Sequence, residues 1–209
     1  MSSLNLLLIG ATGGTGGELL PRLLDAGHTV TALVRRPEAV ILKHGRLTVL
    51  AGEVRDAAAV DRAVRGRDAV VCAFGPRSLK KDDIQEVLMR NLVAAMERHG
   101  VKRLVNLSAW GADPNTRPHG LLQFVLQKGL LGHVFADKAR GEAILFASKL
   151  EYVNVCPGRL LDKPARGGVR ASADGAGLKA ILTRADLAQW MIAQLTDGTW
   201  VRRSPILGY

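Results

Sequence analysis

Short runs of apolar residues alternate along the chain with longer stretches whose apolar residues recur every three or four positions. The first run covers residues 4–9, and the clearest helical pattern covers residues 84–99 and stops at a glycine. The pattern predicts strands near residues 4–9, 29–34, 47–50, 69–73, 103–107 and 152–155, with weaker extended segments near 169–171 and 204–207. It predicts helices from the glycine-rich segment after residue 9 to about residue 26, then over residues 57–64, 84–99, 133–148 and 187–195. Nearly continuous apolar strands that alternate with helices indicate a parallel sheet covered on both faces, so residues 1–209 are expected to form a single doubly wound α/β domain.

Two regions are rich in loop residues, at about residues 109–135 and 157–180. Each follows a predicted strand, so both are expected at the carboxyl edge of the sheet, where open α/β sheets bind their ligands. Within the first region, residues 120–132 are apolar and carry few charges. This segment is a candidate substrate lid, dimer surface or membrane-contacting patch, and its place soon after Ser108 favours the lid.

Glycines stand at every third position between the first predicted strand and the first predicted helix. The segment reads Gly10-Ala-Thr-Gly-Gly-Thr-Gly16, with the spacing G-x-x-G-x-x-G. Backbone N–H groups of such a turn can approach a pyrophosphate at a helix N-terminus because no Cβ stands in the way. A tight turn of small residues is the alternative, but the position between an apolar run and a helix favours a dinucleotide-binding loop. The expected contacts are Gly10, Thr12, Gly13, Gly14, Thr15 and Gly16.

The end of the second predicted strand indicates which dinucleotide is bound. An acidic residue there would pair with the ribose 2′-hydroxyl of NAD, but this chain has Arg35 and Arg36. A guanidinium matches a 2′-phosphate, so NADPH is the expected cofactor, with the Thr12 hydroxyl near the same phosphate. Further cofactor contacts are expected after the third and fourth strands, at Glu53 and Val54 on the adenine side and at Ala73, Phe74 and Gly75 beside the adenosine ribose and pyrophosphate.

Several segments together resemble an atypical short-chain dehydrogenase/reductase, nearest the NAD(P)H-binding, NmrA-like proteins and the flavin reductase/biliverdin-IXβ reductase group. The resemblance rests on residues 4–16, 33–37, 52–56, 68–75 and 91–108, and in the second half on residues 137–142, 150–160 and 183–188. It implies a Rossmann fold, and it places Pro157 and Gly158 beside the cofactor. Ser108 matches the active-site serine of the group, near the nicotinamide or the substrate. Arg77 matches a basic residue near the flavin reductase pocket, where it would contact a cofactor phosphate or an anionic substrate.

The chain departs from the tyrosine-dependent members of this superfamily. Those members protonate a carbonyl oxygen with the tyrosine of a Tyr-x-x-x-Lys motif, but here Val134 stands four residues before Lys138. Lys138 and Arg159 also occupy positions where the flavin reductases carry histidines. The resemblance therefore implies a cofactor more firmly than it implies a substrate.

These residues favour an NADPH-dependent oxidoreductase that passes hydride to a planar conjugated acceptor of the flavin or quinone type. Such acceptors can draw their proton from solvent, so a dedicated general acid is less necessary. Ser108, Lys138 and Arg159 would line the substrate side. One alternative is a carbonyl reductase or epimerase with an acid other than tyrosine. Another is a redox sensor that binds NADP(H) without turnover.

Composition and charge indicate which kinds of partner and location the protein has. The net charge is +10, but each half of the chain carries the same excess of five, and no basic run or recognition motif points to nucleic acid. No apolar run approaches the roughly 20 residues of a membrane-spanning helix. Two cysteines suggest reduced thiols and a cytoplasmic protein, and the histidines show no metal-ligand spacing. A small-molecule substrate, a monomer or small homo-oligomer, and no bound metal are therefore expected.

Overall fold

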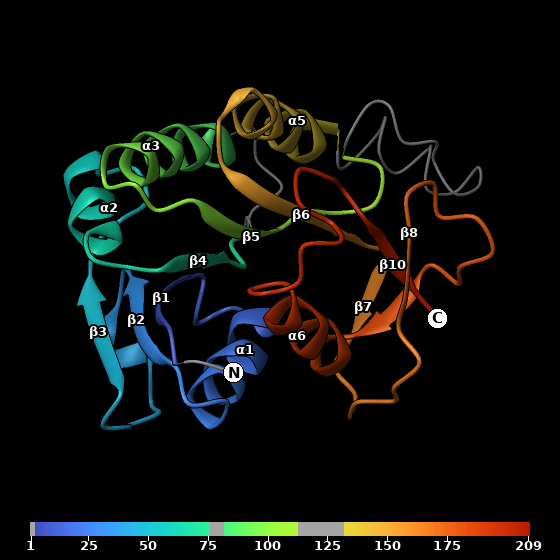
Figure 1. Cartoon of the computed structure of the whole chain (residues 1–209), viewed down its shortest axis with the longest axis horizontal. Coiled ribbons are helices and arrows are strands. Elements are labelled where there is room, and N and C mark those ends of the chain that lie inside the picture. Colours follow the sequence, from blue (N-terminus) through green and yellow to red (C-terminus); the bar gives the residue numbers. More distant parts are fainter. Residues whose placement is uncertain (1–2, 76–81, 113–131) are drawn as a thin grey trace.

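The computed structural model describes residues 3–75, 82–112 and 132–209. Its centre is an eight-stranded sheet with the order β3-β2-β1-β4-β5-β6-β10-β8 (Figure 1). In that order the strands are β3 (Leu47–Ala51), β2 (Thr29–Val34), β1 (Asn5–Ile9), β4 (Ala69–Cys72), β5 (Arg103–Leu107), β6 (Glu151–Pro157), β10 (Ile206–Gly208) and β8 (Arg170–Ser172). All neighbours pair in parallel except β10 and β8, which are antiparallel. The expected doubly wound parallel sheet is confirmed.

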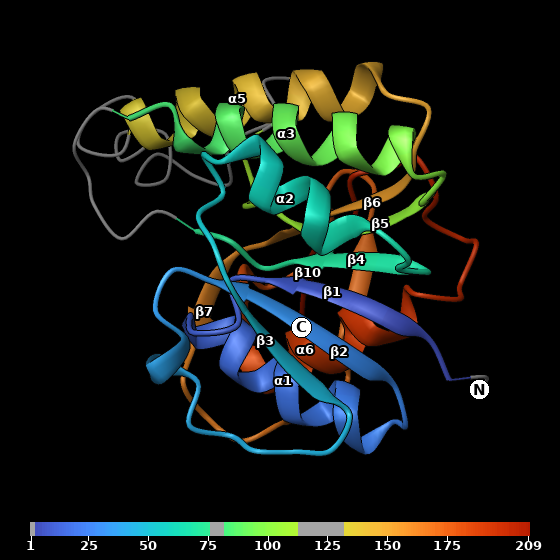
Figure 2. The same ribbon diagram turned by 90° about the vertical axis from the view of Figure 1, so that its left-hand side faces the viewer.

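Helices cover both faces of this sheet (Figure 2). One face carries α2 (Ala57–Val64), α3 (Ile84–Arg98) and α5 (Gly132–Ala147), and the other carries α1 (Gly14–Asp25) and α6 (Arg184–Ala193). Alternate residues of the central strands supply the two apolar cores: Leu6 and Leu8 of β1 pack with α1, whereas Leu7 and Ile9 pack with the α2/α3 side. Burial on both faces is the reason that these strands read as continuous apolar runs.

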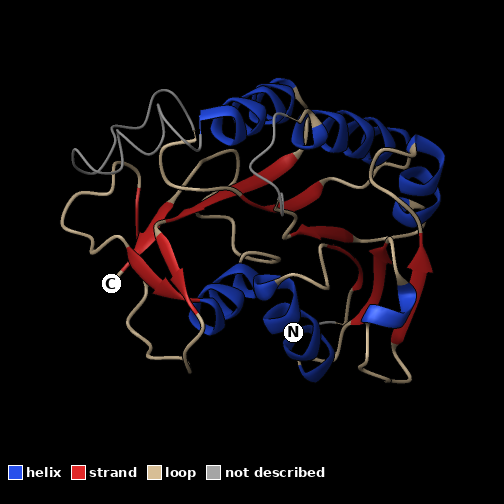
Figure 3. Ribbon diagram, turned by 180° about the vertical axis from the view of Figure 1, so that it is seen from behind, coloured by secondary structure: helices blue, strands red, loops and turns tan. Residues whose placement is uncertain are grey.

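Two short strands and one short helix differ from the sequence prediction. β7 (Arg159–Leu161) and β9 (Ile181–Thr183) pair in parallel as a separate small sheet, at the same end of the molecule as the C-terminus (Figure 3). A 3-10 helix, η1 (Pro37–Ala39), follows β2. These elements have three residues each, too few for a hydrophobic period to be recognised.

The last helix begins three residues earlier than the sequence predicts, at Arg184 rather than at residue 187. The hydroxyl of Thr183 accepts a hydrogen bond from the backbone N–H of Asp186 at 3.1 Å, which caps the helix. Across the described residues, no helix is both long enough and apolar enough to cross a membrane.

The parallel arrangement brings the carboxyl ends of seven strands to one edge of the sheet. β1 and β4 lie side by side at its centre, and the chain leaves them toward opposite faces, so this pair forms the topological switch point. The glycine-rich turn follows β1, and Ala73 and Phe74 follow β4. The fold thus places the predicted site residues at the position where doubly wound sheets bind ligands.

Candidate functional site

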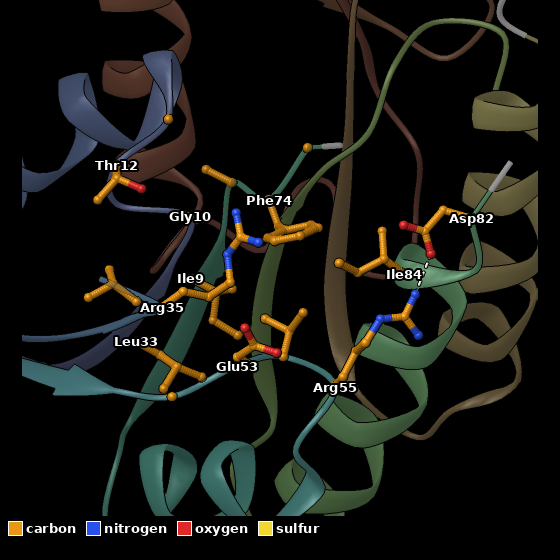
Figure 4. A pocket seen from close by; sticks show the side chains of 16 residues that line it. Ile9, Gly10, Thr12, Leu33, Arg35, Glu53, Arg55, Phe74, Asp82 and Ile84 are labelled. Carbon is orange, nitrogen blue, oxygen red and sulfur yellow. Dashed lines mark hydrogen bonds and ion pairs between the residues drawn. The ribbon is translucent and has the colours of Figure 1, made fainter. Parts of the chain in front are cut away.

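A pocket of about 340 Å³ opens at this edge, and we call it the nucleotide pocket (Figure 4). Nine residues that the sequence predicts as cofactor contacts line it: Gly10, Thr12, Gly13, Arg35, Glu53, Val54, Ala73, Phe74 and Gly75. Four consecutive strands, β1 to β4, therefore contribute their following turns to one pocket. Its walls are apolar at Ile9, Leu33 and Ile84, as expected of a site that receives a flat base.

The glycines of the turn have different roles. A Cβ on Gly10, whose φ is +88°, would lie 2.6 Å from the carbonyl oxygen of Ala73, and a Cβ on Gly16 would collide with the carbonyl oxygen of Gly10. These two glycines allow β1, β4 and α1 to pack closely. Gly13 lines the pocket, and α1 begins directly after it without a side-chain cap. Its first backbone N–H groups thus provide an anion site at the helix N-terminus.

Gly14 makes room for an arginine that the sequence reasoning did not assign to the site. A Cβ on Gly14 would lie 2.7 Å from Nε of Arg184, so this side chain rests on the first turn of α1. Arg184 is the first residue of α6, and it also forms an ion pair with Asp162 at 2.6 Å. Gly14 and Arg184 are far apart in the sequence, so no local sequence pattern reveals that they are in contact.

Of the two arginines after β2, Arg35 lines the nucleotide pocket and Arg36 does not. Figure 4 shows the Arg35 side chain extending into the pocket. Arg36 is exposed and begins the short helix η1. The position of Arg35 fits the expected contact with a 2′-phosphate.

An ion-pair cluster that the sequence did not indicate closes one side of the nucleotide pocket. Arg55, which follows β3, pairs with Asp82 (Figure 4). It also pairs with Asp83, at 2.6 Å. The hydrogen bond from Arg55 lowers the pKa of Asp83. The cluster joins the turn after β3 to the start of α3, two walls of the same pocket.

Ser108 lies directly after β5, beside a second, much smaller space. It is buried, and its hydroxyl donates a hydrogen bond to Oε1 of Glu142. The Nζ atom of Lys138, half-buried, donates to the carbonyl oxygen of Leu107 at 3.4 Å. We call the adjoining space the Ser108 cavity; it measures about 10 Å³, room for roughly one water molecule. Its lining comprises Gln85, Met89, Asn106, Ser108, Lys138, Gly141 and Glu142.

Glu142 is the residue of this cavity that the sequence reasoning missed. It is only 3% exposed, and its Oε1 also accepts a hydrogen bond from Nδ2 of Asn154 at 3.1 Å. The oxygen of the Asn154 amide in turn accepts from Asn106 at 2.8 Å. One signal was available: Lys138 and Glu142 are four residues apart, so they share a face of one helix.

The close packing of α5 on α3 positions these side chains. A Cβ on Gly141 would lie 2.9 Å from the carbonyl oxygen of Gln85, so only glycine allows this approach. Asp137 accepts hydrogen bonds from the backbone N–H groups of Gln85 and Glu86, at 2.9 and 3.2 Å. A carboxylate of α5 therefore caps the N-terminus of α3.

Burial lowers the pKa of Lys138, and the carboxylate of Glu142 opposes that shift. The amine thus lies beside Ser108 in an environment that eases loss of its proton. Such a perturbed group at the edge of a ligand site is a candidate for proton transfer or for stabilising negative charge.

The other predicted site residues lie elsewhere. Arg159 is exposed at the start of β7, and in the described part of the chain no ion pair joins it to another residue. Gly158 makes a packing contact, since a Cβ there would collide with the carbonyl oxygen of Ala180. Pro157 ends β6, and Thr15 is buried in α1. Arg77 and nearly all of the apolar segment 120–132 lie outside the described residues.

Comparisons with known proteins show the family and the fold. A family model described as NAD(P)H-binding matches residues 10–198. A reductase of Streptomyces griseus, named for (4-alkanoyl-5-oxo-2,5-dihydrofuran-3-yl)methyl phosphate, is 41% identical over 108 residues, which are 52% of this chain and 36% of that protein. The chain thus spans about a third of the length of that curated relative.

Solved structures share the fold over the whole chain. A short-chain dehydrogenase/reductase of Veillonella parvula in complex with NADP has a TM-score of 0.80 at 20% identity, covering 99% of this chain and 95% of that one. ChuY, an anaerobillin reductase from Escherichia coli O157:H7, has a TM-score of 0.81 at 22% identity, covering 98% and 96%. Because the family model spans most of the chain and its nucleotide pocket lies at the switch point of a doubly wound sheet, the chain belongs to the NAD(P)H-binding protein family.

Proposed function

We propose that this protein is an NADPH-dependent reductase that passes hydride to a planar conjugated acceptor of the flavin or quinone type. The observation that carries the proposal is the surroundings of Lys138. A half-buried ammonium lies beside Ser108 at the ligand edge, and Val134 stands one helical turn earlier, where a tyrosine acid would be needed. A conjugated acceptor spreads the incoming charge over its rings, so a cation beside it can replace a dedicated tyrosine.

The residues of the nucleotide pocket fit NADPH. In this proposal Arg35, which lines the pocket, contacts the 2′-phosphate, and the N-terminus of α1 with Arg184 contacts the pyrophosphate. Glu53 and Val54 line the same pocket and would contact the adenine edge. When bound, NADPH supplies the hydride. In this proposal Ser108 and Lys138, which line the Ser108 cavity, bind and orient the acceptor.

The relatives' names support a reductase. The Streptomyces griseus protein is named as the reductase of an oxo-dihydrofuran, a ring whose double bond is conjugated with carbonyl groups. ChuY is named as an anaerobillin reductase. Both names describe reduction rather than alcohol oxidation.

The test is NADPH consumption with menadione, FMN and FAD, compared with a panel of ketones and aldehydes. Replacing Lys138→Met, which keeps the length of the side chain and removes its charge, should lower turnover of the preferred conjugated acceptor by about 10²-fold. Lys138→Arg should retain more activity. Lys149→Met, an identical change at an exposed position, is the control.

Two results would contradict the proposal. Ketone turnover well above that of every flavin and quinone would indicate a carbonyl reductase with an unusual acid. Tight NADPH binding with no turnover of any acceptor would indicate a redox sensor.

A further inference from the structure

We propose that Glu142 acts through Ser108 as a positioning residue: its protonation state decides whether the Ser108 hydroxyl can donate to the acceptor. The inference rests on the proposed reductase function. It identifies the groups that supply the proton which the acceptor takes up together with the hydride. The motivating juxtaposition is that Ser108, Lys138 and Glu142 line the Ser108 cavity together, with the buried Asn154 hydrogen-bonded to Glu142.

A serine hydroxyl has one hydrogen to donate and two lone pairs. In this structure the hydrogen of Ser108 is directed to Oε1 of Glu142. An ionised carboxylate can only accept, so in this state Ser108 offers an acceptor nothing but lone pairs. Ser108 can stabilise or protonate an acceptor that has gained negative charge only when Glu142 carries a proton and donates it back.

The neighbours of Glu142 hold its carboxyl group in place for this exchange. Nδ2 of Asn154 donates to the same oxygen at 3.1 Å, and Asn154 is completely buried. Its own amide oxygen accepts from Asn106, which leaves the NH₂ group of Asn154 directed at Glu142. Oε1 of Glu142 therefore accepts from both Ser108 and Asn154.

Lys138 connects this group to a source of protons. It lies one helical turn before Glu142 and lines the same cavity, which has room for roughly one water molecule among several polar side chains. Burial lowers the pKa of Lys138, so its ammonium releases a proton more readily than an exposed lysine does. A proton given up by Glu142 can thus be replaced from Lys138 and finally from solvent.

The step balances as follows. NADPH is oxidised and the acceptor gains its hydride and negative charge; the O–H bond of Ser108 breaks as a bond from that hydrogen to the acceptor forms. The O–H bond of protonated Glu142 breaks at the same time and restores the Ser108 hydroxyl. The resulting carboxylate takes its proton from Lys138, which is reprotonated by water.

The first experiment compares Glu142→Gln with the native enzyme and with Glu97→Gln, the same change at an exposed position of α3. A glutamine can still accept the hydrogen bond of Ser108 but cannot carry the proton. With a turned-over acceptor such as menadione, Glu142→Gln should lower kcat about 10²-fold, while KM and NADPH affinity stay within about twofold. The proposal predicts that kcat of the native enzyme falls with rising pH. This fall should disappear in Glu142→Gln, and Glu142→Asp should restore part of it.

A second measurement needs no turnover. Difference infrared spectroscopy of the NADP⁺ complex between about pH 5 and 9 should detect a protonated carboxylic acid that is absent from Glu142→Gln. An unchanged kcat in Glu142→Gln would overturn the inference. So would a loss of kcat in a variant that is less thermally stable and keeps the native pH profile. If the native enzyme turns over no acceptor, the reductase proposal fails by itself, and the infrared titration decides whether Glu142 holds a proton.

Discussion

Two arginines are expected to hold different parts of the dinucleotide, and removing each in turn tests how the cofactor is placed. Arg35 extends into the nucleotide pocket, and none of the ion pairs found in the described residues includes it. It can therefore bind a 2′-phosphate without giving up a partner. A hydrogen bond to a charged group contributes about 1.5–3 kcal/mol, so Arg35→Ala should weaken NADPH binding about 10- to 100-fold and leave NADH binding unchanged.

Arg184 should behave differently because it must first release Asp162. That aspartate is 84% exposed, so the existing ion pair contributes at most about 1 kcal/mol. Exchanging it for a pyrophosphate leaves a net gain of about 1–2 kcal/mol. Arg184→Ala should thus weaken NADPH and NADH alike, by about 5- to 30-fold.

Calorimetric titration of both cofactors against the native protein, Arg35→Ala, Arg184→Ala and Asp162→Ala makes the comparison. The last variant frees Arg184 and should bind both cofactors as well as the native protein or more tightly. Equal native affinity for NADPH and NADH would refute the role of Arg35. A selective effect of Arg184→Ala on NADPH would show that this arginine contacts the 2′-phosphate and not the pyrophosphate.

The glycine turn and the start of α6 give further tests. Gly13→Val should abolish cofactor binding in a folded protein, whereas Gly16→Val should lower the melting temperature, because a Cβ on Gly16 would collide with the carbonyl oxygen of Gly10 while one on Gly13 would lie 3.3 Å from it. Circular dichroism and cofactor titration separate the two, and normal NADPH binding by Gly13→Val would mean that the phosphate lies elsewhere. Burial acts to raise the pKa of Asp186, but hydrogen bonds from Tyr209, Arg166, Thr183 and Gly167 outweigh it and lower the pKa to about 2. Because the folded pKa is depressed, this carboxylate stabilises the fold by about 2 kcal/mol above pH ~4, and the contribution is lost as the pH falls toward 2. Chemical denaturation should therefore show Asp186→Asn less stable than the native protein at neutral pH and the gap closing in acid; a gap independent of pH would contradict this account.

Local patterns predicted the central sheet and much of the nucleotide pocket, and they failed where a contact joins distant segments. Residues 4–16 contain both an apolar run and the glycines that follow it, so strand, turn and helix could be read together. The contact of Arg184 with Gly14 and the bond from Ser108 to Glu142 depend on how α6 and α5 pack. Arg35 and Arg36 were equivalent in sequence, and only the turn into η1 separates them.

The start of α3 belongs to both halves of the site. The side chain of Gln85 donates a hydrogen bond at 3.5 Å to the carbonyl oxygen of Phe74, which lines the nucleotide pocket. The backbone N–H of Gln85 donates to the carboxylate of Asp137, which precedes Lys138 in α5. Ile84, one residue earlier, lines the nucleotide pocket itself. In the proposed reductase, cofactor and acceptor would therefore both border the start of α3, and a ligand that fixes this segment on one side would fix it for the other. Thermodynamic linkage would make such an effect mutual, so that each ligand changes the affinity of the other by the same factor.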